Sequence, residues 1–172
     1  MRQKNWENKF IIDILVLEMK NIALIVSLIL ITTNCFAAAS SNNNSKTGLY
    51  KSGKKLVLKA KKLEKKNKIE KALKLYSKAY EKLIKAYDKD KKNPDILNYL
   101  GYTLRKTGNF EKAEGYYLKG LELDADHLGI NEYLGELYVQ TGRIKLAKER
   151  LEVLNGCNCE EYDELKELIE NN

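Results

Sequence analysis

The chain has 172 residues, of which 32% are charged, and a formal net charge of +7. It contains one proline, which favours helices over a fold of strands and tight turns. It also contains one histidine and no dense cluster of histidine and carboxylate residues, which leaves little from which to build a metallohydrolase or a histidine-based catalyst. We therefore expect a non-enzymatic protein without a cofactor.

The first part of the chain is typical of an export signal. Residues 22–31 form an uninterrupted apolar run, shorter than the about 20 residues of a spanning helix, and the small residues after Cys35 fit a signal-peptidase site. A Met-Lys-Asn segment directly precedes the run, which makes Met19 a candidate translation start. Residues 1–18 would then be an upstream extension that was annotated in error. We expect a cleaved signal peptide over 19–39, and hence a periplasmic or secreted protein of a Gram-negative bacterium.

Two alternatives remain open for this segment. Residues 22–39 carry no charge, so they would also serve as an uncleaved membrane anchor, and the protein would then be a membrane-tethered structural adaptor. Cys35 would be the acylated residue if the protein were a lipoprotein. The polar residues 40–52 that follow are predicted to be a flexible linker.

Three helical hairpins are predicted after the linker, in units of residues 53–93, 94–127 and 128–161. In the first unit, apolar residues recur at helical spacing from Ile69 to Tyr87. This unit is seven residues longer than the next, and we assign the extra length to two added turns on its second helix.

The second and third units show clear boundaries. Asn93 and Pro94 suit an N-cap and a first helical position, and Gly108 and Gly142 suit the turns inside the two hairpins. Gly156, preceded by asparagine, suits a helix C-terminus. A last helix over 160–170 would cap the stack. The expected helices of the two units are 95–107, 110–123, 128–141 and 144–154.

The two units repeat with a period of 34 residues. The segment Tyr99-Leu100-Gly101 recurs at 133–135, and Thr107-Gly108 recurs at 141–142. A glycine inside a helix costs about 1 kcal/mol relative to alanine, so its recurrence at Gly101 and Gly135 indicates the close approach of a neighbouring helix. A period of this length marks a stack of supersecondary units, which binds partners through its surface and seldom performs chemistry.

The repeated residues resemble the tetratricopeptide repeat, a helix–turn–helix unit of 34 residues. The resemblance covers about residues 53–161, and it is strongest in the middle unit and weakest in the first. Leu97 and Asn131 depart from it where the family often has tryptophan, and Ala125 departs from it where the family often has proline. The matching residues are Leu100, Gly101, Gly108, Ala113, Tyr117 and Gly120, then Leu134, Gly135, Tyr138, Gly142 and Ala147.

The resemblance implies an all-α, right-handed solenoid whose first helices line a concave groove that holds peptides or partner surfaces. Some family members clamp a C-terminal carboxylate there, and Asn98, Arg105 and Lys106 partly match that clamp. Glu132 and Glu136 in the same groove argue against it. The groove side chains carried over by position are Asn98, Tyr102, Arg105, Lys106, Glu132, Glu136 and Gln140, with Lys54, Lys61 and Lys65 from the first unit.

Charge is divided unevenly along the chain. Residues 46–92 hold 18 Lys and 5 Asp or Glu, net +13, whereas residues 93–172 hold 9 Lys or Arg and 16 Asp or Glu, net −7. A Lys-rich segment is usually a solvated face, and this is the interpretation we favour. The alternatives are a surface for an acidic protein or an anionic membrane, and head-to-tail self-association. Nucleic acid is not an expected partner outside the cytoplasm, and the sequence leaves the oligomeric state undetermined.

Cys157 and Cys159 form the second candidate site. In an oxidising compartment two thiols so close in sequence favour a disulfide that holds the start of the last helix. Binding of a soft metal and a redox function are the alternatives, and they would make the protein a thiol- or metal-handling accessory protein. His127 lies between two units, where a hydrogen bond at a helix boundary is expected rather than catalysis.

The chain has 11 tyrosines, and most of them fall at core positions of the repeat. Tyr76, Tyr99, Tyr117 and Tyr138 are predicted to be packing residues, and Tyr102, Tyr116 and Tyr133 are candidates for anchoring a partner. The sequence thus predicts a protein-interaction module or assembly scaffold.

Overall fold

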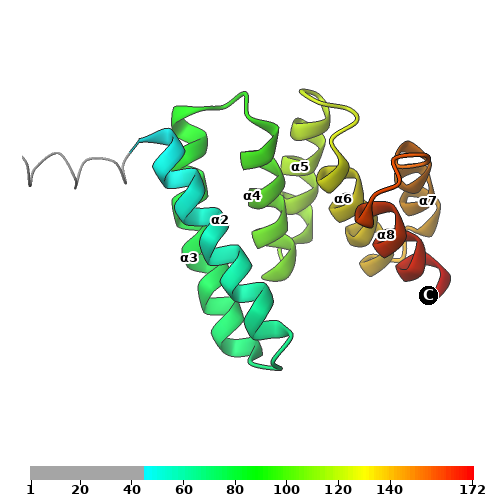
Figure 1. Cartoon of the computed structure of the whole chain (residues 1–172), viewed down its shortest axis with the longest axis horizontal. Coiled ribbons are helices and arrows are strands. Elements are labelled where there is room, and N and C mark those ends of the chain that lie inside the picture. Colours follow the sequence, from blue (N-terminus) through cyan, green and yellow to red (C-terminus); the bar gives the residue numbers. More distant parts are fainter. Residues whose placement is uncertain (1–44) are drawn as a thin grey trace, which may run out of the picture. The chain divides into compact units, whose positions relative to one another are not determined.

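The computed structural model describes residues 45–172, and in this part of the chain every regular element is an α-helix. The predicted signal peptide, the upstream extension and residues 40–44 of the predicted linker lie outside the described residues. Three antiparallel hairpins follow one another along a stack, and a last helix packs at its end (Figure 1). The predicted all-α repeat fold is thereby confirmed. The helices are α2 (Lys46–Glu64), α3 (Ile69–Lys89), α4 (Pro94–Lys106), α5 (Phe110–Leu121), α6 (Leu128–Gln140), α7 (Ile144–Val153) and α8 (Glu160–Glu170).

The helix boundaries of the second and third hairpins lie at caps and turns that the sequence predicts. The side chain of Asn93 accepts a hydrogen bond of 3.3 Å from the backbone N–H of Ile96, and Pro94 occupies the first turn of α4. Gly108 and Gly142 adopt φ angles of +84° and +73° in the turns of the second and third hairpins, a region that only glycine enters without strain. Each predicted boundary in these two hairpins lies within two residues of the observed one.

The first hairpin is longer than we predicted. Helix α2 begins at Lys46, capped by the side chain of Ser45, so residues 46–52 of the predicted flexible linker are helical and that prediction is wrong for them. The assignment of all extra length to the second helix was incomplete, because α2 has 19 residues and α3 has 21, against 13 and 12 in α4 and α5.

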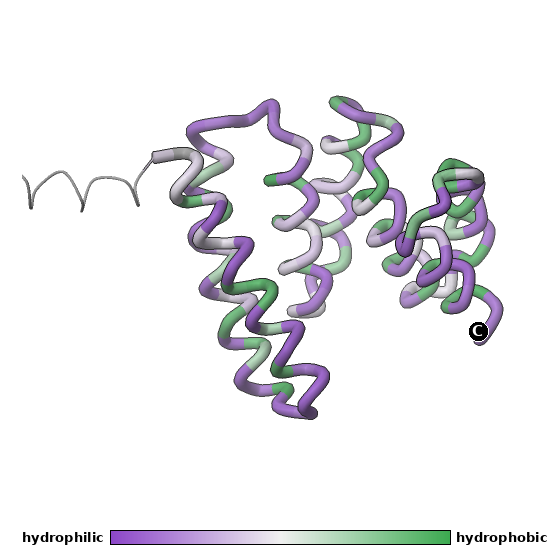
Figure 2. The backbone as a smooth tube through the Cα atoms, viewed as in Figure 1, coloured by the Kyte–Doolittle hydropathy of each residue, from purple (hydrophilic) through white to green (hydrophobic). Residues whose placement is uncertain are grey.

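The added turns of α2 and α3 pack against each other. Leu49 in α2 is buried in the same core as Leu83 and Ala86 in α3, and Gly53 allows α2 to approach Leu83 closely. Hydrophobic residues recur among hydrophilic ones along both helices (Figure 2), which is the pattern of a pair with one packed side and one solvated side. The extension is therefore a continuation of the hairpin, with its own core.

Both repeated glycines lie where a neighbouring helix comes close, as predicted. A Cβ on Gly101 would lie 2.5 Å from the ring of Tyr117 in α5, and a Cβ on Gly135 would lie 2.5 Å from a methyl group of Leu165 in α8. Tyr117 and Leu165 are both fully buried. Helix α8 thus packs onto α6 and closes the core of the third hairpin.

The first helices of the hairpins form the inner side of the stack. Cα atoms of α4 come within 8 Å of both α2 and α6, whereas α3 and α5, or α5 and α7, do not approach each other so closely. Successive units are therefore closer together on the side of α2, α4 and α6, which makes that side the concave one. No helix in the described residues is both long enough and apolar enough to cross a membrane.

Candidate partner-binding groove

Four tyrosines lie along the concave side, and we call them the tyrosine row: Tyr50, Tyr99, Tyr102 and Tyr133. The ring centroids of Tyr50 and Tyr99 are 6.0 Å apart, and those of Tyr102 and Tyr133 are 4.7 Å apart. Tyr102 is buried, while the other three are partly exposed. The row joins all three units, since Tyr50 is in α2, Tyr99 and Tyr102 are in α4, and Tyr133 is in α6.

Lysines of α2 lie over these rings. The Nζ atom of Lys54 is 5.5 Å from the ring centroid of Tyr99. That of Lys61 is 5.6 Å from the centroid of Tyr102 and 5.7 Å from that of Tyr133. At these distances an ammonium group is attracted by the electron-rich face of the ring. Two of the three lysines predicted for the groove in the first unit therefore contact its aromatic surface.

Arg105, a predicted groove residue, is buried inside the stack. Its Nη1 atom lies 2.7 Å from Oε2 of Glu136, and its guanidinium lies over the rings of Tyr102 and Tyr133. Burial by itself would lower the pKa of Arg105, but Tyr117 and Glu136 more than offset this and raise it. Arg105 is therefore a permanently charged link between α4 and α6.

Lys106 is also engaged by the chain itself. Its Nζ atom lies 2.9 Å from Oε1 of Glu64, and the hydroxyl of Tyr76 donates a hydrogen bond of 2.8 Å to the other carboxylate oxygen. The Glu64 carboxylate therefore joins the first hairpin to α4. Both cations of the carboxylate clamp considered from the sequence, Arg105 and Lys106, thus already hold carboxylates of this protein.

The remaining predicted groove residues differ widely in exposure. Glu132 is buried, and its pKa is raised to about 9 by burial, by a hydrogen bond with Glu164 of α8 and by the charge of Glu136. It is therefore protonated at neutral pH and connects α6 to α8. Gln140 is exposed at the end of α6. Lys65 lines a small cavity of about 150 Å³, together with Glu132 and the acidic first residues of α8.

A larger cleft of about 440 Å³ opens where α4, α6 and α8 begin, and we call it the acidic cleft. Its walls come from the first turns of α4 and α6, from the loop between α5 and α6, and from the first turn of α8. Asn98 is 5% exposed, and its Oδ1 atom makes no hydrogen bond within the described residues. The lining residues are Asp95, Asn98, Tyr99, Asp124, Asp126, His127, Leu128, Gly129, Tyr133 and Glu161.

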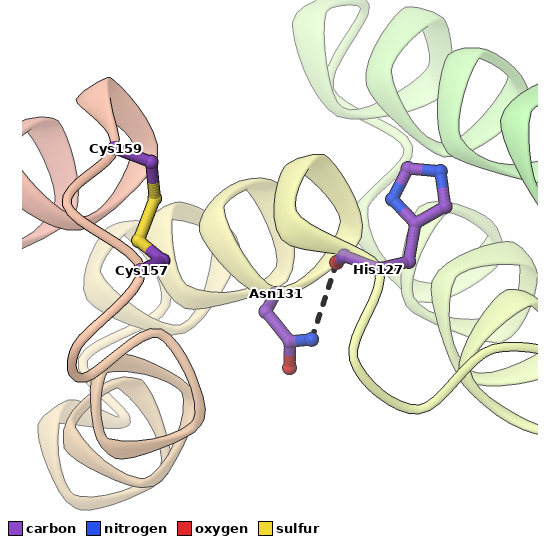
Figure 3. Close-up of a disulfide and its surroundings, with 4 residues drawn as sticks. All are labelled: His127, Asn131, Cys157 and Cys159. Atoms are coloured by element: carbon purple, nitrogen blue, oxygen red, sulfur yellow. Dashed lines mark hydrogen bonds between the residues drawn. A yellow bond between two sulfur atoms is a disulfide. The ribbon is translucent and has the colours of Figure 1, made fainter.

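His127 caps α6, in agreement with the prediction of a hydrogen bond at a helix boundary. Its Nδ1 atom accepts a hydrogen bond of 3.2 Å from the N–H of Ile130, so the proton of the neutral ring is on Nε2, which lies 3.5 Å from Asp95. The side-chain amide of Asn131 donates to the carbonyl oxygen of His127 (Figure 3). It also donates to the carbonyl oxygen of Ala125. These bonds hold the loop that forms one wall of the acidic cleft.

Cys157 and Cys159 are joined by a disulfide in the loop that leads into α8 (Figure 3). Their Cα atoms are 5.2 Å apart, and α8 begins at the next residue, Glu160. The bond thus has the predicted structural position at the start of the last helix. Within the described part of the chain, no three His, Cys, Asp or Glu side chains gather as they would around a metal ion.

The acidic cleft is the feature that the sequence analysis missed. Its carboxylates come from three separate segments, α4, the loop after α5 and the start of α8. The pair Asp124 and Asp126 was the only local signal, and two aspartates in a loop are too common to indicate a site. Tyr99 packs against the core as predicted, and its exposed part also forms the cleft wall.

Comparisons with known proteins identify one family match and several similar folds. Residues 94–127 match the model of the tetratricopeptide repeat family. No curated protein matches the chain in sequence. Solved structures with similar folds include the Yersinia enterocolitica type III secretion translocator chaperone SycD, at 18% identity, covering 78% of this chain and 89% of that one with a TM-score of 0.49.

Two further structures are similar over comparable lengths. The Arabidopsis OM64 TPR domain is 14% identical, covering 72% of this chain and 98% of that one with a TM-score of 0.48. The second TPR domain of human RPAP3, solved with an HSP70 peptide, is 19% identical with the same coverage and TM-score. The middle hairpin, α4 and α5, is therefore a tetratricopeptide repeat in sequence as well as in fold.

Proposed function

We propose that this protein holds a peptide segment or partner surface against the concave side of α2, α4 and α6, and that it acts as an assembly scaffold in the periplasm. The tyrosine row is the observation that carries the proposal. Tyrosine supplies a large, rigid contact area with few rotatable bonds, which is why it is frequent among residues that dominate binding energy. In this row three of the four rings remain partly open to a partner.

Charged groups beside the row would set the orientation of the partner. Lys54 lies over Tyr99, Lys61 lies over Tyr102 and Tyr133, and the acidic cleft opens beside Tyr99 and Tyr133. Exposed charges contribute more to orientation and association rate than to affinity. Arg105 and Lys106 support the groove through their internal ion pairs, so they do not serve as direct partner contacts in this proposal.

The experiment that tests the proposal is site-specific photo-cross-linking in intact cells. Benzoylphenylalanine is placed at Lys54 or Lys61 on the concave side, and at Lys74 or Lys148 on α3 and α7 as matched controls. We expect the concave positions to cross-link to the same discrete partner, because only that side carries the tyrosine row. Equal cross-linking from all four positions, or none from the concave pair, would contradict the proposal.

A further inference from the structure

We propose that the solvent side of α2 binds an anionic phospholipid surface, so that the first hairpin holds the protein against a membrane. The proposal goes beyond the peptide-binding groove and rests on a separate set of residues. We call this set the lysine row: Lys51, Lys55, Lys59, Lys62 and, in the turn after α2, Lys66.

The lysine row lies on the face of α2 that no other described helix covers. Its four helical members recur at steps of four, four and three residues, which places them along one face over about 16 Å. By the same spacing that face is opposite Val57 and Ala60, which are buried in the core of the first hairpin. Among the described helices α2 approaches only α3 and α4 (Figure 1), and all five lysines are exposed.

Nothing on α2 neutralises the lysine row. The one acidic residue of this helix, Glu64, already binds Lys106 and the hydroxyl of Tyr76. None of the five lysines forms an ion pair with another residue in the part of the chain that the structure describes. Like charges three or four residues apart on a helix repel each other, so the row destabilises α2 while it is only solvated. A surface of opposite charge would remove that repulsion.

The composition of this face favours lipid over an acidic protein. Residues 46–92 contain 18 lysines and no arginine. Lysine carries a compact charge without the planar fork that arginine offers to a single carboxylate, so it suits a surface of diffuse charge. Leu58 is 47% exposed and lies three residues after Lys55 and four before Lys62, on the same face. An apolar side chain among lysines is suited to the boundary between lipid headgroups and acyl chains.

The uncharged segment 22–39 gives the lysine row a membrane to meet. Both interpretations of this segment, signal peptide and anchor, place it in a membrane during export. Six residues, 40–45, separate it from the start of α2, and six residues span at most about 20 Å even when fully extended. Export therefore brings the lysine row close to a membrane surface, which it does not do for an acidic protein.

The test is flotation of the exported protein, as the cell produces it, with phospholipid vesicles. One set of vesicles is pure phosphatidylcholine, and the other contains about 30% phosphatidylglycerol, which is anionic. We expect binding to the anionic vesicles to be at least about tenfold stronger at about 0.05 M salt, and to fall at least about fivefold at about 0.5 M salt because salt screens the charges. A retained leader would bind both kinds of vesicle, so the difference between them reports on the lysines.

Two triple variants assign the binding to the lysine row. K55Q with K59Q and K62Q removes three charges of the row, and should weaken binding to the anionic vesicles at least about tenfold. K112Q with K145Q and K148Q removes three exposed lysines of α5 and α7, and should leave binding within about twofold of the wild type. All six side chains are exposed, so both variants should keep the helix content of the wild type in circular dichroism.

Three outcomes would overturn the proposal. The first is an equal loss in the two variants, which would show a response to net charge alone. The second is equal binding of the wild type to both kinds of vesicle, or binding to neither. The third is salt-sensitive binding to soluble polyglutamate, lost in the row variant, without a preference for anionic vesicles, which would assign the row to an acidic protein. Cross-linking from the groove uses other residues, so it decides the proposed function separately.

Discussion

Glu132 is the residue whose environment differs most from what its type suggests. A glutamate is normally charged and solvated, but this one is 3% exposed between α6 and α8, with Glu164 of α8, Glu136 of its own helix and Lys61 of α2 nearby. Burial, and after it the two carboxylates, disfavour the ionised form of Glu132, and Lys61 only partly compensates. Its pKa is therefore raised to about 9, and its proton is part of the packing between α6 and α8.

This arrangement predicts that the protein loses stability as pH rises. Between the ordinary glutamate pKa of 4.5 and the folded value of about 9, the folded state keeps a proton that the unfolded chain has released. The contribution of Glu132 to the free energy of unfolding is therefore fully present below that window, and it decreases as pH rises through the window. We expect the wild type to lose at least about 1.4 kcal/mol between pH 5 and pH 9, the equivalent of one pKa unit.

The measurement is urea unfolding at pH 5, 7 and 9, followed by circular dichroism. Glu132→Gln stays neutral throughout, so its stability should change less over this window than that of the wild type. Glu149→Gln, on the exposed side of α7, should follow the wild type. Parallel profiles for the wild type and Glu132→Gln would show that Glu132 is not protonated in the folded protein.

At the scale of elements, helix approach depends on a few small residues. Gly101 faces the ring of Tyr117, and Gly120 faces Ile130 of the next unit, so one glycine serves the inside of a hairpin and the other the packing between hairpins. Gly115, also in α5, has no atom within 4 Å of the position its Cβ would take. These glycines therefore differ in function although all three lie in helices.

Substitution by alanine at Gly101 and Gly115 should have opposite effects. Gly101→Ala forces the added methyl group against a fully buried ring and should destabilise the protein by about 1–3 kcal/mol. Gly115→Ala adds only helix propensity and should stabilise it by up to about 1 kcal/mol. Chemical unfolding of the two variants measures both, and destabilisation by Gly115→Ala would show that an unrecognised contact covers that position.

Helix boundaries were predictable wherever a local signal marked them. Asn93, Pro94, Gly108 and Gly142 act within one turn of the backbone, so the pattern of residues was sufficient. The start of α2 has a local cap, Ser45, but this serine is one of several polar residues in 40–52 that could cap a helix, so it did not stand out. Leu49 is buried only because α3 continues far enough to place Leu83 and Ala86 beside it. Helical spacing was visible in α3 from Ile69 to Tyr87, but residues 46–52 are too few to show a period of their own.

At the scale of the whole molecule, the charge division in the sequence has a counterpart in the fold. The Lys-rich residues 46–92 form the first hairpin, and the acidic residues are concentrated in the acidic cleft and α8. The ion pairs of the groove do not follow this division, because Glu64 of the Lys-rich hairpin pairs with Lys106, and Arg105 and Glu136 both belong to residues 93–172. Many lysines of the first hairpin remain exposed, which agrees with the solvated face favoured from the sequence.

Export is a property of the whole chain, and mass spectrometry of the exported protein tests it. We expect an intact mass that begins near Ala38 or Ser40, because a signal peptidase would cut after the small residues that follow the apolar run. The same measurement under non-reducing conditions should show the Cys157–Cys159 bond as a loss of two hydrogen atoms. A mass that retains residues 22–39 would indicate the membrane-tethered alternative instead.

The sequence by itself determined the repeat, the hairpins, the caps and the glycines of close approach, because all of these arise from interactions within a helix or between neighbouring helices. Only the tertiary structure decided which polar groove residues remain open to a partner. Arg105, Lys106 and Glu132 follow the same positional pattern as true groove residues, yet each is engaged by a group from another helix. The acidic cleft likewise exists only because stacking brings three acidic segments together. Pairing of charges depends on distances across the fold, which a local pattern does not contain.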